Sequence, residues 1–171
     1  ESESLDPSTN WATWRGPTGD GHAMASSVPT SWNGFVSAAW VADVPGRGHS
    51  SPIVVGDLIV LAAADEANQK QMVLAYDRNT GDRVWEKVLH EGKFPRKDQM
   101  HEKGTHANST LACDGKRTFI AFLNNDKIIA SALDLQGELV WQKEIGAFSA
   151  RVGYAASTVL YKSFVIFTAD T

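Results

Sequence analysis

The chain has 171 residues, which is enough for one domain with a hydrophobic core. Its 16 basic and 20 acidic residues give a net charge of −4, which argues against a nucleic-acid-binding surface. The sequence contains no run of about 18 apolar residues, so no membrane-spanning helix is predicted. The single cysteine, Cys113, excludes an internal disulfide and a cysteine-rich metal cluster.

Residues 1–36 are predicted to form an extended N-terminal segment anchored by tryptophan. Trp11 and Trp14 lie three residues apart in front of a loop rich in Gly and Pro, and Arg15 is placed to stack on an indole. Residues 37–44 follow as a short predicted strand that carries a further tryptophan but has no hairpin of its own. That strand needs a partner from elsewhere, because buried backbone groups are almost always hydrogen-bonded.

The rest of the chain alternates apolar runs with turn residues, which predicts antiparallel strands. A first four-stranded unit is expected over residues 45–92, and a long charged connection follows at 93–108. Connections of that length are often functional. A second unit is expected over 109–146, and a third begins within 154–171.

The first two units share one pattern of residues around a turn. It runs Ala, Asp, Gly and Trp in that order, and the first copy has an additional Thr before the Gly. The residues are Ala75, Asp77, Thr80, Gly81 and Trp85 in the first unit, and Ala132, Asp134, Gly137 and Trp141 in the second. The two tryptophans are 56 residues apart. An internal repeat of this size, made of strands and turns, is typical of the blades of a propeller.

The pattern Ala-x-Asp-x-x-Thr-Gly-x-x-x-Trp resembles the tryptophan-docking motif of the family of pyrroloquinoline-quinone (PQQ)-like propeller repeats. The run Trp-x-x-Trp-Arg-Gly-Pro at 11–17 resembles the opening of secreted bacterial members related to the outer-membrane barrel-assembly lipoprotein. The resemblance implies an all-β, PQQ-like β-propeller of four-stranded antiparallel blades, of which this chain holds an incomplete arc of about three. The other interpretation of the repeat is two unrelated hairpins, each with a core tryptophan.

In that family the indole packs between adjacent blades, and the Asp and Thr hold the hairpin turn. The resemblance therefore assigns Trp85 and Trp141 to contacts between blades, and residues 37–44 to a strand that closes the ring. Closed propellers have about four to eight blades, so we expect the remainder of the propeller or another chain to complete the ring. The resemblance also implies export to the periplasm or the cell surface.

Five residues at the starts of the predicted inner strands are candidates for a ligand site. They are His49, Ser51, His106, Asn108 and Tyr154. In a propeller such positions face the axial channel near its mouth, so we expect their side chains to converge there. The alternative is that they satisfy exposed backbone groups at the strand starts and bind only water.

No catalytic residue and no metal site are assigned. His101 and His106 are five residues apart with Gly104 between them, whereas a zincin needs His-Glu-x-x-His on one helical face. A looser metal site that uses these two histidines and His49 stays open. Cys113 lies in a predicted inner strand and is expected to be a core residue.

Two classes of function remain. The first is a non-catalytic binding or scaffold module with a protein or carbohydrate partner. The second is the N-terminal part of a PQQ-dependent alcohol or sugar dehydrogenase, which would hold PQQ with calcium. Alcohol-oxidising members of that group carry adjacent cysteines against the cofactor, and this chain has only Cys113. No set of Glu, Asn and Asp ligands for calcium is assignable either, so no cofactor is expected.

Overall fold

The computed structural model describes residues 5–24, 29–149 and 152–169. Its elements in chain order are η1 (Gly34–Ser37), β1 (Ile53–Val55), β2 (Leu58–Asp65), β3 (Lys70–Asp77), β4 (Arg83–Glu91), η2 (Lys97–Gln99), β5 (Ala112–Cys113), β6 (Arg117–Asn124), β7 (Lys127–Asp134), β8 (Leu139–Ala147), β9 (Val159–Tyr161) and β10 (Phe164–Ile166). Parts of the predicted N-terminal segment, at 1–4 and 25–28, and the last two residues of the predicted third unit lie outside the described residues.

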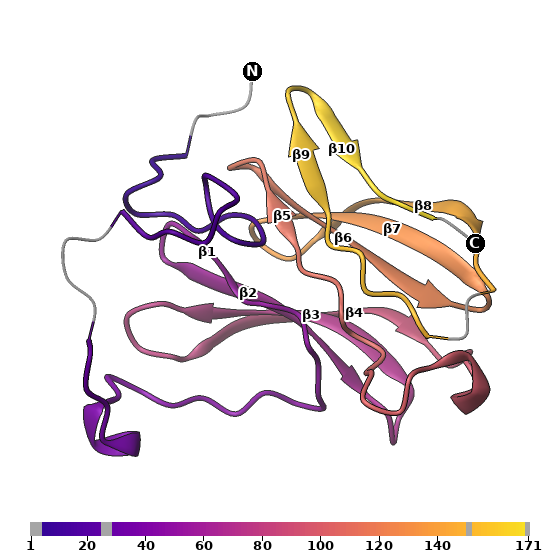
Figure 1. Cartoon of the computed structure of the whole chain (residues 1–171), viewed down its shortest axis with the longest axis horizontal. Coiled ribbons are helices and arrows are strands. Elements are labelled where there is room, and N and C mark those ends of the chain that lie inside the picture. The colour runs from indigo at the N-terminus through magenta and orange to yellow at the C-terminus, as the bar shows by residue number, and fades with distance from the viewer. Residues whose placement is uncertain (1–4, 25–28, 150–151, 170–171) are drawn as a thin grey trace.

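The strands form two four-stranded antiparallel sheets and one hairpin (Figure 1). The order is β1-β2-β3-β4 in the first sheet and β5-β6-β7-β8 in the second, and β9 pairs with β10. Each sheet is a meander, because every strand pairs with its neighbours in sequence. These sheets confirm the predicted all-β class and its four-stranded antiparallel units. Neither of the short helices found in the described residues has the length or apolarity needed to cross a membrane.

The segment before the first sheet is irregular. η1 ends at Ser37, and residues 38–44 join no strand ladder within the described part of the chain. Trp40 still contacts the first sheet, since its Nε1 donates a hydrogen bond to the carbonyl oxygen of Arg78 over 2.9 Å. The role of residues 37–44 as the ring-closing strand, like the predicted domain boundaries, stays a prediction.

The main hydrophobic core lies between the two sheets. One cluster of buried residues joins Val60 and Val73 of the first sheet to Ile120 and Phe122 of the second. β3 is buried at every position except its two ends, so both of its faces are covered. A strand buried on both faces reads as a continuous apolar run, as the sequence of β3 does.

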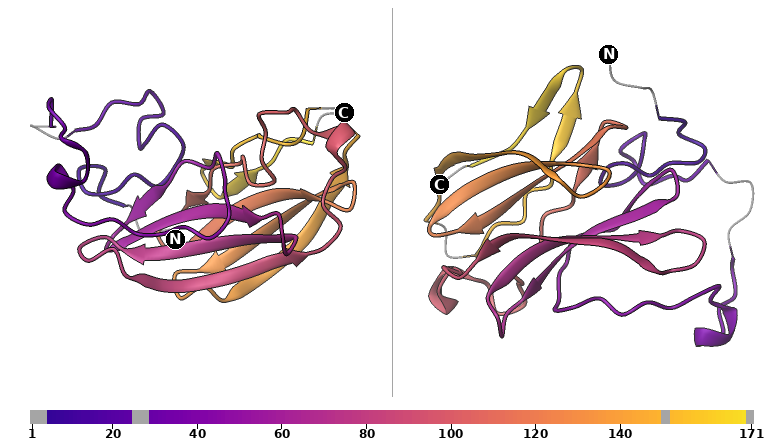
Figure 2. Two further views of the ribbon diagram at one scale, coloured as in Figure 1. Left: turned by 90° about the horizontal axis from the view of Figure 1, so that it is seen from below. Right: turned by 180° about the vertical axis from the view of Figure 1, so that it is seen from behind.

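The N-terminal segment crosses the first strands of both sheets (Figure 2). Trp11 pairs with Val54 of β1 through two backbone hydrogen bonds of 2.8 and 2.9 Å. The carbonyl oxygen of Ala12 then accepts a hydrogen bond of 2.8 Å from the amide of Cys113 in β5. Gly16 lies on the indole of Trp11, since a Cβ at this position would come within 2.6 Å of the ring. The segment is therefore held against the inner strands, as its tryptophans suggest.

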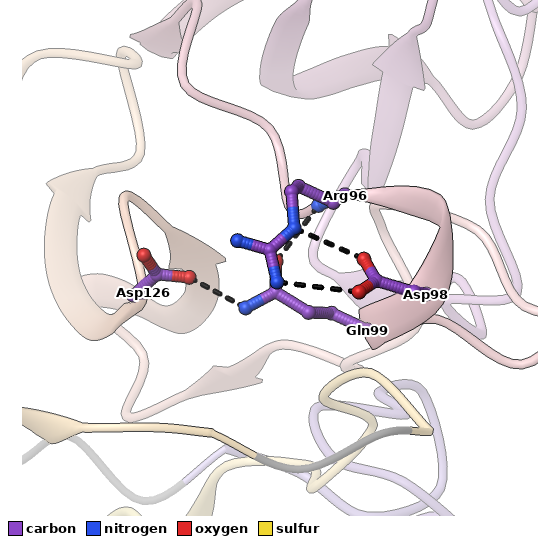
Figure 3. Close-up of polar contacts among 4 residues, drawn as sticks. All are labelled: Arg96, Asp98, Gln99 and Asp126. Atoms are coloured by element: carbon purple, nitrogen blue, oxygen red, sulfur yellow. Dashed lines mark hydrogen bonds and ion pairs between the residues drawn. The ribbon is translucent and has the colours of Figure 1, made fainter.

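The long connection between the sheets is tied to the surface of the second sheet (Figure 3). Within the connection, Arg96 pairs with Asp98 over 3.0 Å. The side chain of Gln99 donates a hydrogen bond of 2.7 Å to Asp126, which lies in the turn between β6 and β7. These contacts fix the position of η2 relative to the second sheet.

A buried amide network holds the other end of the connection. The side-chain nitrogen of Gln71, in β3, donates hydrogen bonds to the carbonyl oxygens of His106 over 2.8 Å and Leu123 over 3.0 Å. Asn124 donates to the side-chain oxygen of Gln71 over 3.2 Å and to the carbonyl oxygen of Gly92 over 2.8 Å. Gln71 thus joins the first sheet, the second sheet and the connection at one point.

Replacing Gln71 with Leu should lower the free energy of unfolding by about 2 kcal/mol, because two buried carbonyl oxygens lose a donor and the Asn124 amide loses one of its two acceptors. Urea unfolding gives this value, and the exposed Gln136→Leu is the matched control. Hydrogen exchange of the amides at 93–108 should also accelerate in the Gln71 variant. Equal stability of the two variants would show that the network does not hold the connection.

The buried His90 should make the free energy of unfolding depend on pH. Its side chain is only 9% exposed, packs edge-on against Phe122, and has an unpaired Nε2 among the described residues. Burial lowers the pKa of His90 to about 4 from its ordinary value of 6.5. Between these values the unfolded chain binds a proton that the folded chain does not, so stability falls as the pH falls through this window.

Between pH 8 and pH 5, protonation of His90 on unfolding should lower the free energy of unfolding by about 2 kcal/mol. Urea unfolding at several pH values measures it, and His90→Leu should remove this part of the slope. The exposed His22→Gln is the matched histidine substitution for comparison, since His22 contacts Asp20 at the surface. A slope that survives in His90→Leu would contradict the assignment.

Candidate functional site

A groove of about 640 Å³ opens where the inner strands of the sheets begin. One wall is the N-terminal loop, and the other is formed by the segments that lead into the first sheet, β5 and β9. Its polar or aromatic lining residues are Thr13, Trp14 and Thr18 from the loop, and His49, Asn108, Thr110, Ser157 and Thr158 from the inner-strand side. The groove is therefore shared between parts of the chain that are far apart in sequence.

Two of the five predicted ligand residues line this groove. His49 is exposed, and its backbone amide donates a hydrogen bond of 2.9 Å to the carbonyl oxygen of Ala107. The side-chain oxygen of Asn108 accepts hydrogen bonds from the amide and the hydroxyl of Thr105 over 3.0 and 2.6 Å. Its nitrogen donates to the carbonyl oxygen of Tyr154 over 3.4 Å. These bonds fix the orientation of the Asn108 side chain.

His106 and Tyr154 line a separate cavity of about 10 Å³, which Asn108 also borders. That volume suits at most a single water molecule. The His106 ring lies 4.2 Å from the ring of Phe94, and burial lowers its pKa. Burial also raises the pKa of Tyr154 to about 12. Both groups are thus held in their neutral forms around neutral pH.

Ser51 lies in neither the groove nor the small cavity. Its backbone amide donates a hydrogen bond of 3.0 Å to the hydroxyl of Thr110. The five residues therefore do not form one cluster: His49 and Asn108 share the groove, His106 and Tyr154 lie beside it, and Ser51 supports its wall. A ligand role for each of them stays a prediction.

The N-terminal loop supplies groove residues that were not among the candidates. Trp14 is 50% exposed, and the guanidinium of Arg15 lies 4.5 Å from the centre of its ring, which confirms the predicted stacking. The feature of the sequence that indicates this wall is the Trp-x-x-Trp spacing, which marks a loop anchored by indoles. Trp11 anchors the loop on β1, and Trp14, three residues later, lines the groove.

The repeated turns are held by their aspartates. In the first sheet, Asp77 accepts hydrogen bonds from the amides of Asn79 over 2.7 Å and Thr80 over 2.9 Å. The hydroxyl of Thr80 in turn donates to Asp82 over 2.9 Å. In the second sheet, Asp134 accepts two equivalent bonds of 3.0 and 2.8 Å from the amides at 136 and 138. The hydrogen bonds to Asp77 lower its pKa.

Each of two indoles lies on the turn of the following sheet. Trp85 in β4 donates from Nε1 to the carbonyl oxygen of Leu135 over 2.9 Å, and a Cβ on Gly137 would lie 2.7 Å from its ring. Trp40 makes the same pair of contacts in the turn of the first sheet, where a Cβ on Gly81 would lie 2.5 Å from its ring. Glycine is needed at both turns because it allows this close approach.

The remaining residues of the repeated pattern fit beside the indoles. Ala75 is directly opposite Trp85 across β3 and β4, and Ala132 is directly opposite Trp141 across β7 and β8. Trp141 is half-buried, and its ring lies 6.1 Å from that of Phe119 in its own sheet. A contact between Trp141 and a further blade stays a prediction.

The family of the chain follows from its sequence. Residues 37–169 match the PQQ-type family model described as outer membrane protein assembly factor BamB. The chain belongs to this family. The match confirms the resemblance to PQQ-like propeller repeats, and it covers both sheets and the β9–β10 hairpin.

A solved relative shows the same fold. The crystal structure of BamB from Moraxella catarrhalis superposes with a TM-score of 0.54 at 15% identity. The match covers 75% of this chain and 36% of that one, so the chain spans about a third of that relative's length. The two sheets and the hairpin are thus part of a propeller, as predicted. No curated protein matches the chain.

A europium-containing methanol dehydrogenase is also similar, at 11% identity and a TM-score of 0.34. That match covers 59% of this chain and 25% of the dehydrogenase. A likeness of this size carries no argument about activity. Within the described residues, no three His, Cys, Asp or Glu side chains are placed to hold a metal ion. Cys113 is buried, and burial raises its pKa to about 11, so its thiol stays protonated near neutral pH.

Proposed function

We propose that this chain is part of a non-catalytic, PQQ-like propeller that binds a partner or ligand at the mouth of its channel. The groove between the N-terminal loop and the inner strands carries this proposal, because it is concave and combines polar groups with a half-exposed indole. Membership of the BamB-described family supports a binding or scaffold role. The same membership supports export to the periplasm or the cell surface of a bacterium.

The groove residues do not fit PQQ with calcium. PQQ carries several carboxylates, and calcium prefers carboxylate and carbonyl oxygens. None of the described residues that line the groove is Asp, Glu, Lys or Arg. The groove therefore offers neither a carboxylate for the metal nor a cationic side chain for the cofactor, and we assign no step to PQQ. The alternative, the N-terminal part of a PQQ-dependent dehydrogenase, would need its ligands from other parts of a ring.

Calorimetric titration of the complete propeller that contains this chain, with PQQ and Ca²⁺, tests the non-catalytic proposal, because the dehydrogenase alternative takes its ligands from other parts of the ring. We expect no binding with a dissociation constant below about 1 μM, because the groove has no charges to meet the cofactor. Asn108→Ala should leave the titration unchanged. Submicromolar binding that is lost in Asn108→Ala would overturn the proposal in favour of the dehydrogenase.

A further inference from the structure

One wall of the groove offers hydrogen-bond acceptors, and the other offers a hydrogen-bond donor. On the loop wall, the hydroxyls of Thr13 and Thr18 already donate, to the carbonyl oxygen of Gly16 over 2.9 Å and to Asp20 over 2.6 Å. Their oxygens therefore remain as acceptors. On the inner-strand wall, the Ser157 oxygen accepts from the amide of Thr110 over 3.2 Å, which leaves its proton to donate.

A hydroxyl group can satisfy both walls, since it donates one hydrogen bond and accepts others. The charged groups nearest to the groove do not line it. Arg15 lies on the ring of Trp14, and Asp20 is bonded to Thr18. An anionic or cationic ligand would thus find no counter-charge among the described residues that line the groove.

Trp14 gives the groove an apolar surface beside these polar groups. Trp14 is 50% exposed, and the Arg15 guanidinium lies 4.5 Å from the centre of its ring. A flat aromatic ring packs against apolar C–H faces, while the polar groups around it bind the hydroxyls. A ring with an apolar face and a hydroxyl edge matches this arrangement.

An extended peptide is disfavoured by the state of the strand edges. A peptide that binds by strand addition needs free backbone groups on an edge. Next to the groove, β1 is already paired with Trp11, and the amide of Cys113 in β5 is bonded to Ala12. The N-terminal segment thus occupies the backbone groups through which a peptide would add to β1 or β5.

We infer that the groove binds a neutral saccharide, as a free oligosaccharide or as part of a glycan. This inference rests on the proposed binding function and names its ligand class. Trp14 stacks on the sugar ring, Ser157 donates to a sugar hydroxyl, and Thr13 and Thr18 accept from others.

Saccharide binding is tested with maltotriose, cellotriose and N,N′,N″-triacetylchitotriose, by saturation-transfer NMR and tryptophan fluorescence. We expect at least one of the three to bind, and Trp14→Ala to weaken that binding by about tenfold or more, with about threefold for Ser157→Ala. Trp32→Ala is the matched control, since Trp32 is 68% exposed and does not line the groove. Far-UV circular dichroism checks that each variant is folded.

The outcomes separate this inference from the proposed function. If no trisaccharide binds, or if binding survives in Trp14→Ala, the saccharide inference is wrong. A Gly-Ser-Gly-Ser-Gly peptide that binds instead would overturn it while leaving a binding module in place. Submicromolar PQQ binding that is lost in Asn108→Ala, in the separate titration, would overturn the proposed function itself.

Discussion

Gly137→Ala should lower the free energy of unfolding by about 2–5 kcal/mol, whereas Gly92→Ala should lower it by about 1 kcal/mol. Both glycines have positive φ, 87° and 73°, so both substitutions carry the same backbone cost. The difference lies in what a Cβ would meet. At Gly137 it would lie 2.7 Å from the ring of Trp85, and at Gly92 it would meet nothing within 4 Å.

Because the Trp85 ring is rigid, the turn and the indole must move apart to admit a methyl group at Gly137. That movement lengthens or breaks the 2.9 Å hydrogen bond from Trp85 to Leu135. Urea unfolding of the 171-residue chain measures both substitutions. If Gly137→Ala and Gly92→Ala lower the free energy of unfolding by the same amount, the Trp85 indole does not pack closely against the turn.

Trp85→Ala should cost about 3 kcal/mol, the lower end of the usual range for a core tryptophan, because the ring is half-buried. The lost contacts are the ring on the turn of the second sheet and the hydrogen bond to Leu135. Trp85→Phe should keep most of the packing and cost about 1 kcal/mol for the lost donor. Trp32→Ala, at a position that is 68% exposed, should change stability by less than about 0.5 kcal/mol.

The repeated units could be predicted from sequence because their signals are local. Alternating apolar runs and turn residues set the strands, and Asp77 and Asp134 bond to amides within four residues of themselves. The two four-stranded antiparallel sheets follow from these local signals. Residues 38–44 form no ladder with any strand of the described chain, although the sequence predicts a strand there.

The groove could be predicted only in part, because it depends on contacts between distant segments. His49 and Asn108 reach it from the starts of inner strands, as expected. His106 and Tyr154 instead turn toward Phe94 and Phe148, and the irregular backbone there has no period from which a side-chain direction follows. The Trp-x-x-Trp spacing indicates an anchored loop, but the place of Trp14 in the groove depends on the pairing of residue 11 with β1, a contact between distant segments.

A double-mutant cycle between Trp85 and Gly137 tests most directly whether the two sheets are consecutive blades joined by an indole on a glycine turn. In the wild-type background Gly137→Ala should cost about 2–5 kcal/mol, and in the Trp85→Ala background about 1 kcal/mol, as at Gly92. The predicted coupling is thus at least about 1 kcal/mol. If Gly137→Ala costs the same with and without the indole, the contact does not join the blades.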